Sequence, residues 1–195
     1  MELKALFKFG KTPPNSVIID TTSGSSHFRE LSPFILGPIC IGNTIASNFE
    51  NLWQYSKVYQ QHVGKTSEPT DKWFEWHQEG LADKYAHRYP MGKGTIPLYS
   101  YWFGEHLDYI TARKRIYAPI YAEYVQKTQA YENLLLQYNE CCRTDTNLIL
   151  LDYDAYDHKA LGMTLKEVIN NPYRKCGHAF ILLMILKFEL LECLK

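Results

Sequence analysis

The stretch "TNLILLDYDAYDH", residues 146–158, contains the clearest strand signal of the chain. Its apolar run from Leu148 to Leu151 has the length of a buried strand, and the acidic, aromatic residues that follow end it in a loop. Most other apolar patterns repeat every three or four residues, which is the spacing of helices. The sequence therefore predicts an α+β fold that is mainly helical and has a few short strands.

Two helices are predicted after this strand. Thr164 and Glu167 form a capping-box pattern at the start of "TLKEVIN", and this helix stops before Pro172. The run "AFILLMIL", from Ala179 to Leu186, is too short to cross a bilayer. It predicts a buried terminal helix.

The residues before the strand give a mixed pattern. Residues 108–138 read as helix, but Pro119 interrupts them and predicts a break between two helices. "DKWFEWHQEGL" predicts a short helix, "SVIID" a strand preceded by a loop, and "LSPFILGPICIG" an extended segment that Gly42 and Asn43 turn. Residues 85–107 contain two prolines and three glycines and predict a long loop anchored by aromatic side chains.

The first strong helix is expected in "SNFENLWQYSKVY", residues 47–59, with a second capping-box pattern at Ser47 and Glu50. Its core face is the apolar arc of Phe49, Leu52, Trp53, Ser56, Tyr59 and Val63. Glu50, Gln54 and Lys57, spaced i, i+4 and i+7, form a polar stripe beside Trp53. That stripe is either a solvated edge or the wall of a site, and spacing alone favours the solvated edge.

Composition places the chain among globular proteins. Its 195 residues suit a single domain, and 46% of them are hydrophobic. The formal net charge is zero, so the whole molecule exerts no general attraction on nucleic acid or a membrane. Five cysteines without a Cys-x-x-Cys motif, and no secretory signal, predict a reducing, cytoplasmic location.

The acidic loop is the first candidate for chemistry outside the helix. Asp152, Asp154, Asp157 and His158 follow a buried strand, which would hold them in place while the loop leaves them accessible. A carboxylate there could act as a general base or stabilise a developing cation. The alternative is an Asp-rich turn whose side chains bond to nearby backbone.

The segment "NPYRKCGH" is a second candidate, because Arg174, Lys175 and Gly177 precede a helix. Helix N-termini bind anions, so phosphate is a reasonable ligand, although basic residues there are also common as plain surface. The cations of "TARKRIY", residues 111–117, are expected on the surface. The Cys176 and His178 pair lacks a metal-ligand pattern, and no dinucleotide or phosphate-loop motif is present, so neither a metal nor a cofactor is expected.

Taken in order, these motifs resemble those of the NADAR proteins (NAD- and ADP-ribose-associated), a superfamily that includes N-glycosidases. "LSPFILGPI" resembles their N-terminal motif, and "ENLWQYSK" keeps the Glu, Gln and Lys of their first helix. "DYDAYDH" and "CGHAFILLM" stand where the family has an acidic, aromatic loop and a final helix. The resemblance covers residues 25–187 and implies a single domain with an N-glycosidase fold.

The resemblance implies cleavage of a ribose C–N bond in an ADP-ribosyl or ribosyl base, as a nucleotide or within ADP-ribosylated nucleic acid. Glu50 would stabilise the oxocarbenium-like transition state or activate water, and Lys57 would attack the anomeric carbon. Asp154 or Asp157 would supply a second carboxylate. The implied substrate-binding residues are Ser32, Phe34, Trp53, Gln54, Tyr101, Trp102, Arg174, Gly177 and His178.

The chain also departs from the NADAR pattern. Pro33 stands where the family has Asn, Asn51 where it has His, and Tyr156 with Asp157 where it has Trp-Gly. These differences concern the substrate more than the fold and are consistent with a divergent, phage-type branch. A non-catalytic ADP-ribose or nucleotide-binding module, an ADP-ribosyl or glycosyl transferase, and a structural protein with the 85–103 loop as its contact surface remain as alternatives. The sequence does not fix the base or the oligomeric state.

Overall fold

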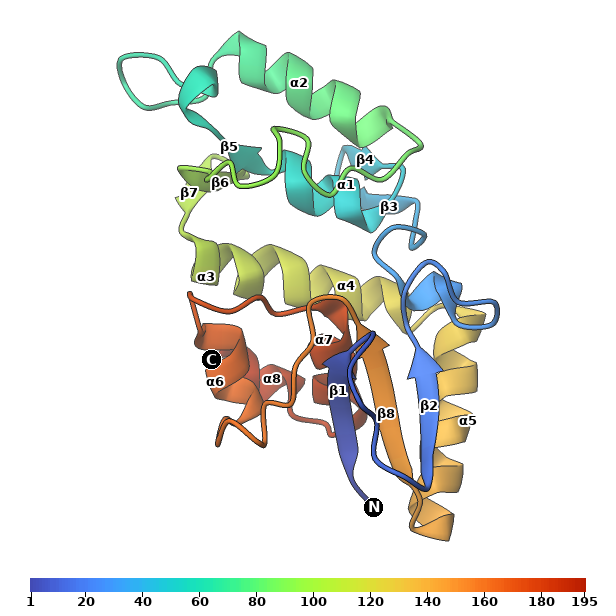
Figure 1. The fold of residues 1–195 in the computed structure, drawn as a ribbon. Helices are drawn as coiled ribbons and strands as arrows, with labels where there is room; N and C mark the ends of the chain where they lie inside the picture. Colours follow the sequence, from blue (N-terminus) through green and yellow to red (C-terminus); the bar gives the residue numbers. More distant parts are fainter. The chain divides into compact units, whose positions relative to one another are not determined.

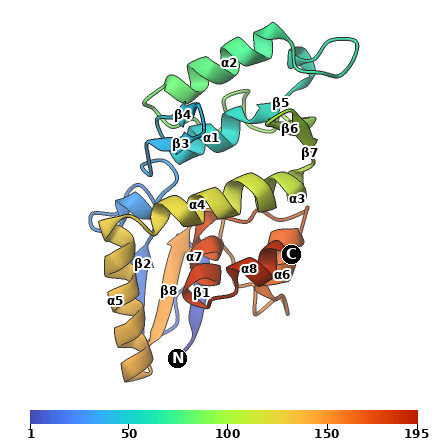
Figure 2. The same ribbon diagram turned by 180° about the vertical axis from the view of Figure 1, so that it is seen from behind.

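A computed structural model describes residues 1–195. The chain divides into two compact units. Unit 1 comprises Met1–Ser32 and Ala118–Lys195, and unit 2 comprises Pro33–Tyr117. Figures 1 and 2 show the helices and short strands of both, which confirm the predicted α+β class. The single-domain assignment stays a prediction.

Unit 1 is built on a three-stranded parallel sheet of order β1-β8-β2. Its strands are β1 (Leu3–Phe7), β2 (Ser16–Asp20) and β8 (Asn147–Asp152). The late strand β8 lies between the two early ones, and its residues Leu148, Ile149 and Leu150 are fully buried. The predicted strands at "SVIID" and "LILL" are confirmed, whereas β1 replaces a predicted loop.

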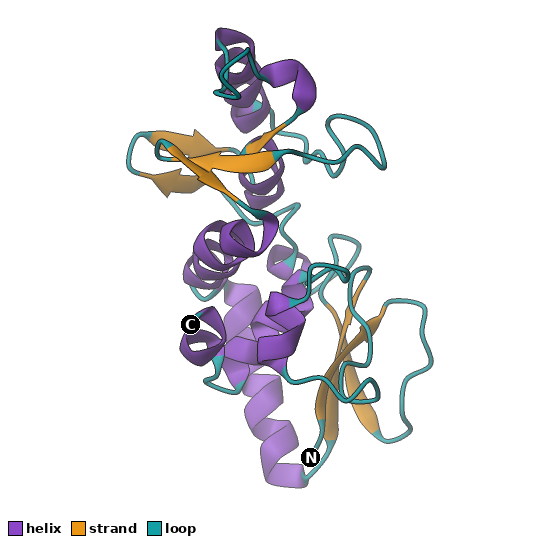
Figure 3. Cartoon of the chain, turned by 90° about the vertical axis from the view of Figure 1, so that its left-hand side faces the viewer, coloured by secondary structure: helices purple, strands orange, loops and turns teal.

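The helices of unit 1 lie on one side of this sheet (Figure 3). They are η1 (Arg29–Leu31), α4 (Ala118–Val125), α5 (Gln129–Thr144), α6 (Leu165–Asn170), α7 (His178–Leu186) and α8 (Leu190–Leu194). Helix α7 is buried at every residue and packs on β1 and β8, as its apolar sequence predicted. The capping box of Thr164 and Glu167 at the start of α6 is also confirmed. None of the helices in the chain has the length and apolar composition needed to cross a membrane.

Proline does not break the helical run where the sequence suggested. Pro119 lies inside α4, directly after the π-helical turn η3 (Arg113–Tyr117), and the break falls at residues 126–128. In a regular α-helix the proline ring clashes with the preceding turn. We attribute the tolerance of Pro119 to the wider π-helical turn before it.

Unit 2 combines two small antiparallel sheets with two neighbouring helices. Strands β3 (Ile39–Ile41) and β4 (Thr44–Ala46) form a hairpin that turns at Gly42 and Asn43, as predicted. Gly42 has a φ of +56°, a conformation that glycine adopts without strain. The second sheet consists of β5 (Lys57–Val58), β6 (Tyr99–Trp102) and β7 (Glu105–Leu107), in that order.

The remaining elements of unit 2 are α1 (Phe49–Tyr55), η2 (Gln60–His62), α2 (Asp71–Ala82) and α3 (Tyr109–Ala112). Helices α1 and α2 pack side by side (Figures 1 and 2). The predicted loop over residues 85–107 is wrong in its second half, because β6 and β7 occupy it. Val58, a residue type that favours strands, pairs with Tyr99 of β6 and helps to explain why β5 forms.

Candidate functional site

Helix α1 begins one residue later than predicted. Asn48 is its N-cap, and the side-chain oxygen accepts the backbone N–H of Asn51 at 2.9 Å. Ser47, the predicted cap, instead donates its hydroxyl to the carbonyl of Ala82, 2.9 Å away. Asn and Ser cap helices about equally well, so the contact of Ser47 with the end of α2 decides between them.

Backbone carbonyls from the segment before β3 complete the start of α1. The carbonyl of Leu36 accepts the N–H of Phe49 at 2.8 Å, and that of Pro33 accepts the N–H of Glu50 at 2.9 Å. The first N–H groups of a helix have no partner within the helix, so these carbonyls satisfy them. The segment that contains the half-buried Phe34 therefore holds the helix that carries Glu50.

Glu50, Gln54 and Lys57 form a continuous line of hydrogen bonds, which we call the polar chain. Gln54 Nε2 donates to Glu50 Oε1 at 2.8 Å, and Lys57 Nζ donates to Gln54 Oε1 at 2.6 Å. A carboxylate only accepts and an ammonium only donates, so the Gln54 amide must turn its nitrogen to Glu50 and its oxygen to Lys57. Gln54 thus links the two charges.

Lys57 reaches this chain from a strand and not from the helix. Helix α1 ends at Tyr55, and Lys57 opens β5, where it pairs with Ser100 of β6. The indole Nε1 of Trp73 donates to the Lys57 carbonyl at 2.9 Å. The predicted helical extension to Val63 is therefore wrong, but α1, α2 and β6 together fix the Lys57 backbone.

Burial decides between the two interpretations of the stripe. Glu50 is 6% exposed and Gln54 8%, while Lys57 is half-buried. Buried carboxylates and amides are retained where they are hydrogen-bonded, as here. Burial excludes a solvated edge for Glu50 and Gln54, and the polar chain leads from the interior to the partly exposed Lys57.

Trp53 supplies an aromatic wall beside the polar chain. The Lys57 ammonium lies 4.8 Å from the Trp53 ring centroid. Tyr117 and Tyr109 lie 5.2 Å and 6.4 Å from the same ring. The Arg113 guanidinium lies 4.4 Å from the Tyr109 ring. Trp53 thus borders the Lys57 end of the polar chain and is itself packed by two tyrosine rings, one of which lies beneath Arg113.

Arg113 is a residue that the sequence analysis missed. It was expected on the surface with its neighbours, but it is only 1% exposed. Arg115 does lie on the surface, where Glu105 binds it at 2.6 Å. The available signal was the i, i+4, i+8 spacing of Tyr109, Arg113 and Tyr117, which puts the arginine on an aromatic face.

Tyr101 and Trp102 lie on β6 and differ in the face they occupy. Side chains alternate along a strand, so Trp102 shares the face of Ser100 and of its partner Lys57, and Tyr101 takes the other face. Tyr101 packs edge-on against Trp73, with ring centroids 5.3 Å apart. Trp102, half-exposed, is therefore the better candidate to stack on a base next to Lys57.

A second buried polar group, the Asp152 cluster, lies in unit 1 and consists of Asp152, His178 and Thr21. Asp152 Oδ2 is 3.2 Å from His178 Nδ1, and His178 Nε2 is 2.7 Å from Thr21 Oγ1. His178 Nε2 is also 2.9 Å from the Thr21 carbonyl, which can only accept, and Thr21 donates its hydroxyl to the Leu151 carbonyl at 2.9 Å. Nε2 is therefore the donor to Thr21. The cluster ties β8, the end of β2 and α7 together, and we assign His178 this structural role.

The N-terminus of α7 already holds an anion from the chain itself. Asp152 Oδ2 accepts the N–H of Ala179 at 3.3 Å. Gly177 is the N-cap, and a Cβ there would overlap this same carboxylate oxygen and lie 3.1 Å from Asp154 Cβ. The phosphate expected at this terminus is thus replaced by the Asp152 carboxylate, and Gly177 permits its close approach.

The other predicted residues of this region contact neighbouring side chains, at the surface or partly buried. Asp154 Oδ1 is 3.1 Å from Lys175 Nζ, and the Arg174 guanidinium lies 5.1 Å from the Tyr156 ring centroid. Asp157 Oδ2 is 3.2 Å from Lys4 Nζ. Burial by itself raises the pKa of Asp157, but the Ala160 N–H and the Lys4 ammonium outweigh it and hold that pKa below its usual value.

The predicted site residues fall into both units. Glu50, Trp53, Gln54, Lys57, Phe34, Tyr101 and Trp102 belong to unit 2, whereas Ser32, Asp154, Asp157, Arg174, Gly177 and His178 belong to unit 1. Ser32 is buried at the end of η1. The role of Asp154 or Asp157 as a second carboxylate stays a prediction. No group of three or more His, Cys, Asp or Glu side chains is arranged to hold a metal ion.

Comparison with known protein families shows to which family the chain belongs. Residues 3–163 match a family described as of unknown function, DUF6939. The chain belongs to the DUF6939 family. No curated protein and no solved structure matches it.

The matched range of this DUF6939 protein includes the whole polar chain and the acidic loop after β8. Arg174, Gly177 and His178 lie beyond the matched residues. The family description carries no activity, so the chemistry of the site rests on its geometry and on the NADAR resemblance.

Proposed function

We propose that this protein is an N-glycoside hydrolase that cleaves the ribose C–N bond of an ADP-ribosyl or ribosyl base. The observation that carries the proposal is the buried polar chain of Glu50, Gln54 and Lys57 beside Trp53. The resemblance to NADAR proteins, remote as a sequence match, supports it. So does the contact of the Pro33 carbonyl with the Glu50 N–H, which joins two of the resembling motifs.

Glu50 suits the charge that this reaction develops. As the C–N bond breaks, positive charge spreads over the anomeric carbon and the ring oxygen of the ribose. A carboxylate held in a poorly solvated position stabilises such a cation more than one in water does. Gln54 keeps Glu50 oriented, and Glu50 can also take a proton from the attacking water.

Lys57 suits a covalent route. The Lys57 ammonium would first release a proton to water. Nζ would then attack the anomeric carbon, forming an N–C bond while the base leaves with the electron pair of the broken C–N bond and takes up a proton that Nζ loses. The ribose ring then opens to an imine as the ring oxygen gains a proton. Water adds to the imine carbon, and Lys57 departs as the free amine. Lys57 is partly exposed, and the contacts of its Nζ with Gln54 and the Trp53 ring fix its position.

The substrate side of the proposal follows from the same residues. Trp102, on the Lys57 face of β6, would stack on the base. The partners are a small nucleotide or an ADP-ribosylated base, including one within nucleic acid, and no cofactor or metal takes part. We place the activity in the cytoplasm, because all five cysteines are free thiols.

A substrate screen tests this proposal. The purified protein is incubated with NAD, ADP-ribose, ADP-ribosylated DNA and RNA, and pyrimidine ribosides, and free base or ADP-ribose is measured by chromatography. We expect release from at least one compound and loss of release in Glu50→Gln. Glu75→Gln, the same change on the exposed face of α2, is the matched control and should keep full activity.

Each alternative gives a different result in this screen. A binding module would retain a compound on the protein without releasing a product, and a transferase would release base only when a nucleophilic acceptor is added. Either result, or release that survives in Glu50→Gln, would contradict the hydrolase.

A further inference from the structure

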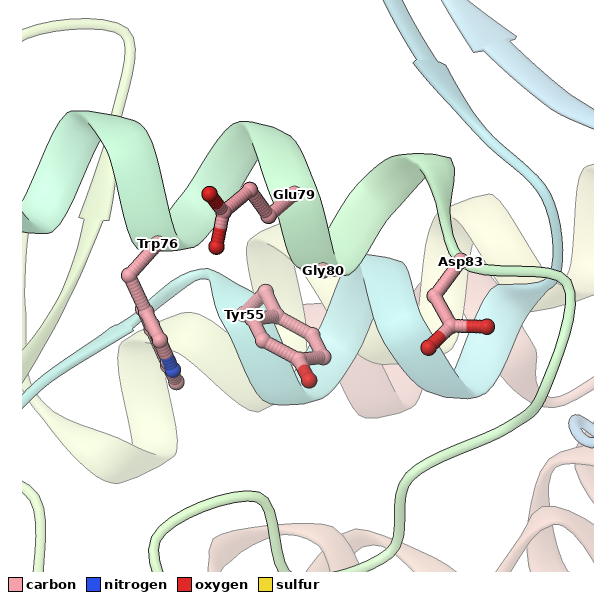
Figure 4. A pocket seen from close by; sticks show the side chains of 5 residues that line it. All are labelled: Tyr55, Trp76, Glu79, Gly80 and Asp83. Atoms are coloured by element: carbon pink, nitrogen blue, oxygen red, sulfur yellow. The ribbon is translucent and has the colours of Figure 1, made fainter.

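A small open pocket lies between α1 and α2 in unit 2, away from the polar chain on α1. Figure 4 shows its lining, Tyr55 from α1 with Trp76, Glu79, Gly80 and Asp83 from α2 and its end. Its volume is about 160 Å³. Tyr55 and Gln54 are consecutive on α1, so their side chains leave the helix about 100° apart. The pocket and the polar chain therefore occupy different faces of α1.

Close packing gives the pocket its shape. Gly80 is buried, and a Cβ at this position would overlap the Tyr55 ring. The missing side chain lets that ring lie directly on α2, where it meets Trp76 at a centroid distance of 4.5 Å. The two rings form one side of the pocket, as Figure 4 shows.

Asn51 holds the other end of the pocket in place. Its Nδ2 donates to the carbonyls of Asp83 and Tyr85, both at 2.9 Å, and its Oδ1 accepts the N–H of His87 at 2.9 Å. Three hydrogen bonds from one buried side chain fix the backbone after α2. The backbone of Asp83 is therefore fixed, and its carboxylate accepts the Tyr85 N–H at 2.9 Å.

The lining has the chemistry of a cation site. Glu79 and Asp83 both line the pocket, with their carboxylates at opposite ends and Tyr55 and Gly80 between them (Figure 4). Burial first, and then the charges of Asp83 and Glu79, raise the pKa of the Tyr55 hydroxyl. The negative field of the two acids thus reaches the aromatic ring, and aromatic faces attract cations as well.

The cations already present do not fill this space. His87 Nε2 is 2.8 Å from Asp83 Oδ2, and the Lys84 ammonium lies 5.1 Å from the Tyr85 ring centroid. Neither residue lines the pocket. Glu79 is exposed, and its carboxylate lies at the opposite end of the pocket from Asp83 (Figure 4).

We infer that this pocket binds one positively charged group of side-chain size, a guanidinium or an ammonium, against Tyr55, Trp76, Glu79 and Asp83. Its volume of about 160 Å³ is below the roughly 300–1,000 Å³ of sites for drug-sized ligands, so a single charged group fits and a nucleotide does not. The group comes either from a small free cation or from an Arg or Lys side chain of a peptide. This site is independent of the hydrolase proposed above.

Tryptophan NMR tests the inference. The protein has four tryptophans, each with one indole N–H signal, and Trp76→Phe assigns the signal of Trp76. Methylguanidinium, tetramethylammonium and an N-acetylarginine amide are titrated, with neutral methylurea as the control. We expect saturable movement of the Trp76 signal with a Kd on the order of millimolar, and no movement with methylurea.

Charge variants give the second measurement. Glu79→Gln should weaken binding of each active probe about fivefold. Glu123→Gln, the same change at an exposed acid on α4 of unit 1, should leave binding unchanged. If only the N-acetylarginine amide saturates the Trp76 signal, the site binds a peptide side chain. If methylguanidinium and tetramethylammonium saturate it as well, the site also binds free cations. The inference is overturned if no cation saturates the signal, if methylurea does so equally, or if Glu79→Gln binds as tightly as the unchanged protein.

Discussion

The polar chain of unit 2 and the Asp152 cluster of unit 1 each contain a buried carboxylate, yet they are built in opposite ways. In the Asp152 cluster the carboxylate, the imidazole and the hydroxyl bond to one another and to the backbone of β8 and α7. The polar chain instead runs outward from buried Glu50 to Lys57, which is partly exposed beside an aromatic ring. A closed cluster holds elements together, whereas a line that leads from a buried acid to an accessible amine can meet a substrate.

The comparison shows how a promising motif can have a structural use. Carboxylates after a buried strand resemble a catalytic loop in sequence. Here Asp152 takes the place of an external anion at the start of α7, and Asp157 pairs with Lys4. Variants of the two regions should therefore differ in kind: those of the Asp152 cluster change stability, and those of the polar chain change chemistry.

Removal of the Asp152 carboxylate should have the largest effect. Asp152→Ala leaves His178 and the Ala179 N–H without their buried acceptor, which should lower the free energy of unfolding by about 3 kcal/mol. Urea denaturation followed by far-ultraviolet circular dichroism measures this change. Asp154→Ala, which removes an exposed pair with Lys175, should cost less than about 1 kcal/mol. Equal losses in the two variants would contradict the structural role of the cluster.

A break in the middle of the polar chain comes next. Gln54→Met keeps the length of the side chain but removes both hydrogen bonds, so Glu50 and Lys57 lose their relative position. We expect kcat/KM on the substrate found in the screen to fall about 100-fold. All four tryptophans belong to unit 2, so their fluorescence checks that this unit stays folded. Gln78→Met on the exposed face of α2 is the control. Unchanged kcat/KM in Gln54→Met would contradict the catalytic role of the polar chain.

Gly177→Ala tests the close approach at α7. The added Cβ overlaps Asp152 Oδ2, and the neighbouring Asp154 Cβ at 3.1 Å restricts the movement that could relieve it. Overpacking of this kind should destabilise the protein by about 2 kcal/mol. Gly162→Ala is unsuitable as a control: nothing lies within 4 Å of the added methyl group, but the φ of +69° would strain an alanine. Ala160→Gly, at a nearby exposed position, is the reference instead. A melting temperature of Gly177→Ala equal to the wild-type value would show that Asp152 does not need this space.

Asp157→Asn should have the smallest effect and the clearest pH dependence. Its pKa lies below the usual 3.8 because the Ala160 N–H and Lys4 outweigh the effect of burial. A lowered pKa means that the stabilisation is complete above pH 3.8 and is lost as the pH falls below that value. The variant should therefore lose under about 1 kcal/mol at neutral pH and nothing in strong acid. Loss of turnover at full stability would instead make Asp157 the second catalytic carboxylate.

Much of the fold could be predicted because it depends on local pattern. The strands at residues 16–20 and 147–152, the capped helix after Thr164 and the apolar α7 follow directly from propensity, capping and apolar runs. Strand β1 could not be predicted in this way, since it pairs with β8 some 145 residues later in the chain. The end of α1 was missed for the same reason: Lys57 and Val58 leave the helix to pair with β6.

The site could be predicted only in part. The spacing of Glu50 and Gln54 placed them correctly on one helical edge, but burial of that edge depends on the packing of the folded unit. Arg113 was hidden among neighbouring cations and in a π-helical turn, which has no simple sequence signal. The roles of Asp152 and Gly177 were missed because they arise from the meeting of β8 and α7.

Borohydride trapping tests the central claim most directly. The protein is incubated with the substrate found in the screen and with sodium borohydride, which reduces an imine to a stable amine, and the modified peptide is identified by mass spectrometry. We predict a ribose-derived adduct on Lys57 that is absent from Lys57→Arg, together with loss of turnover in that variant. Turnover without any adduct in the wild type, and with full activity in Lys57→Arg, would contradict the role of Lys57.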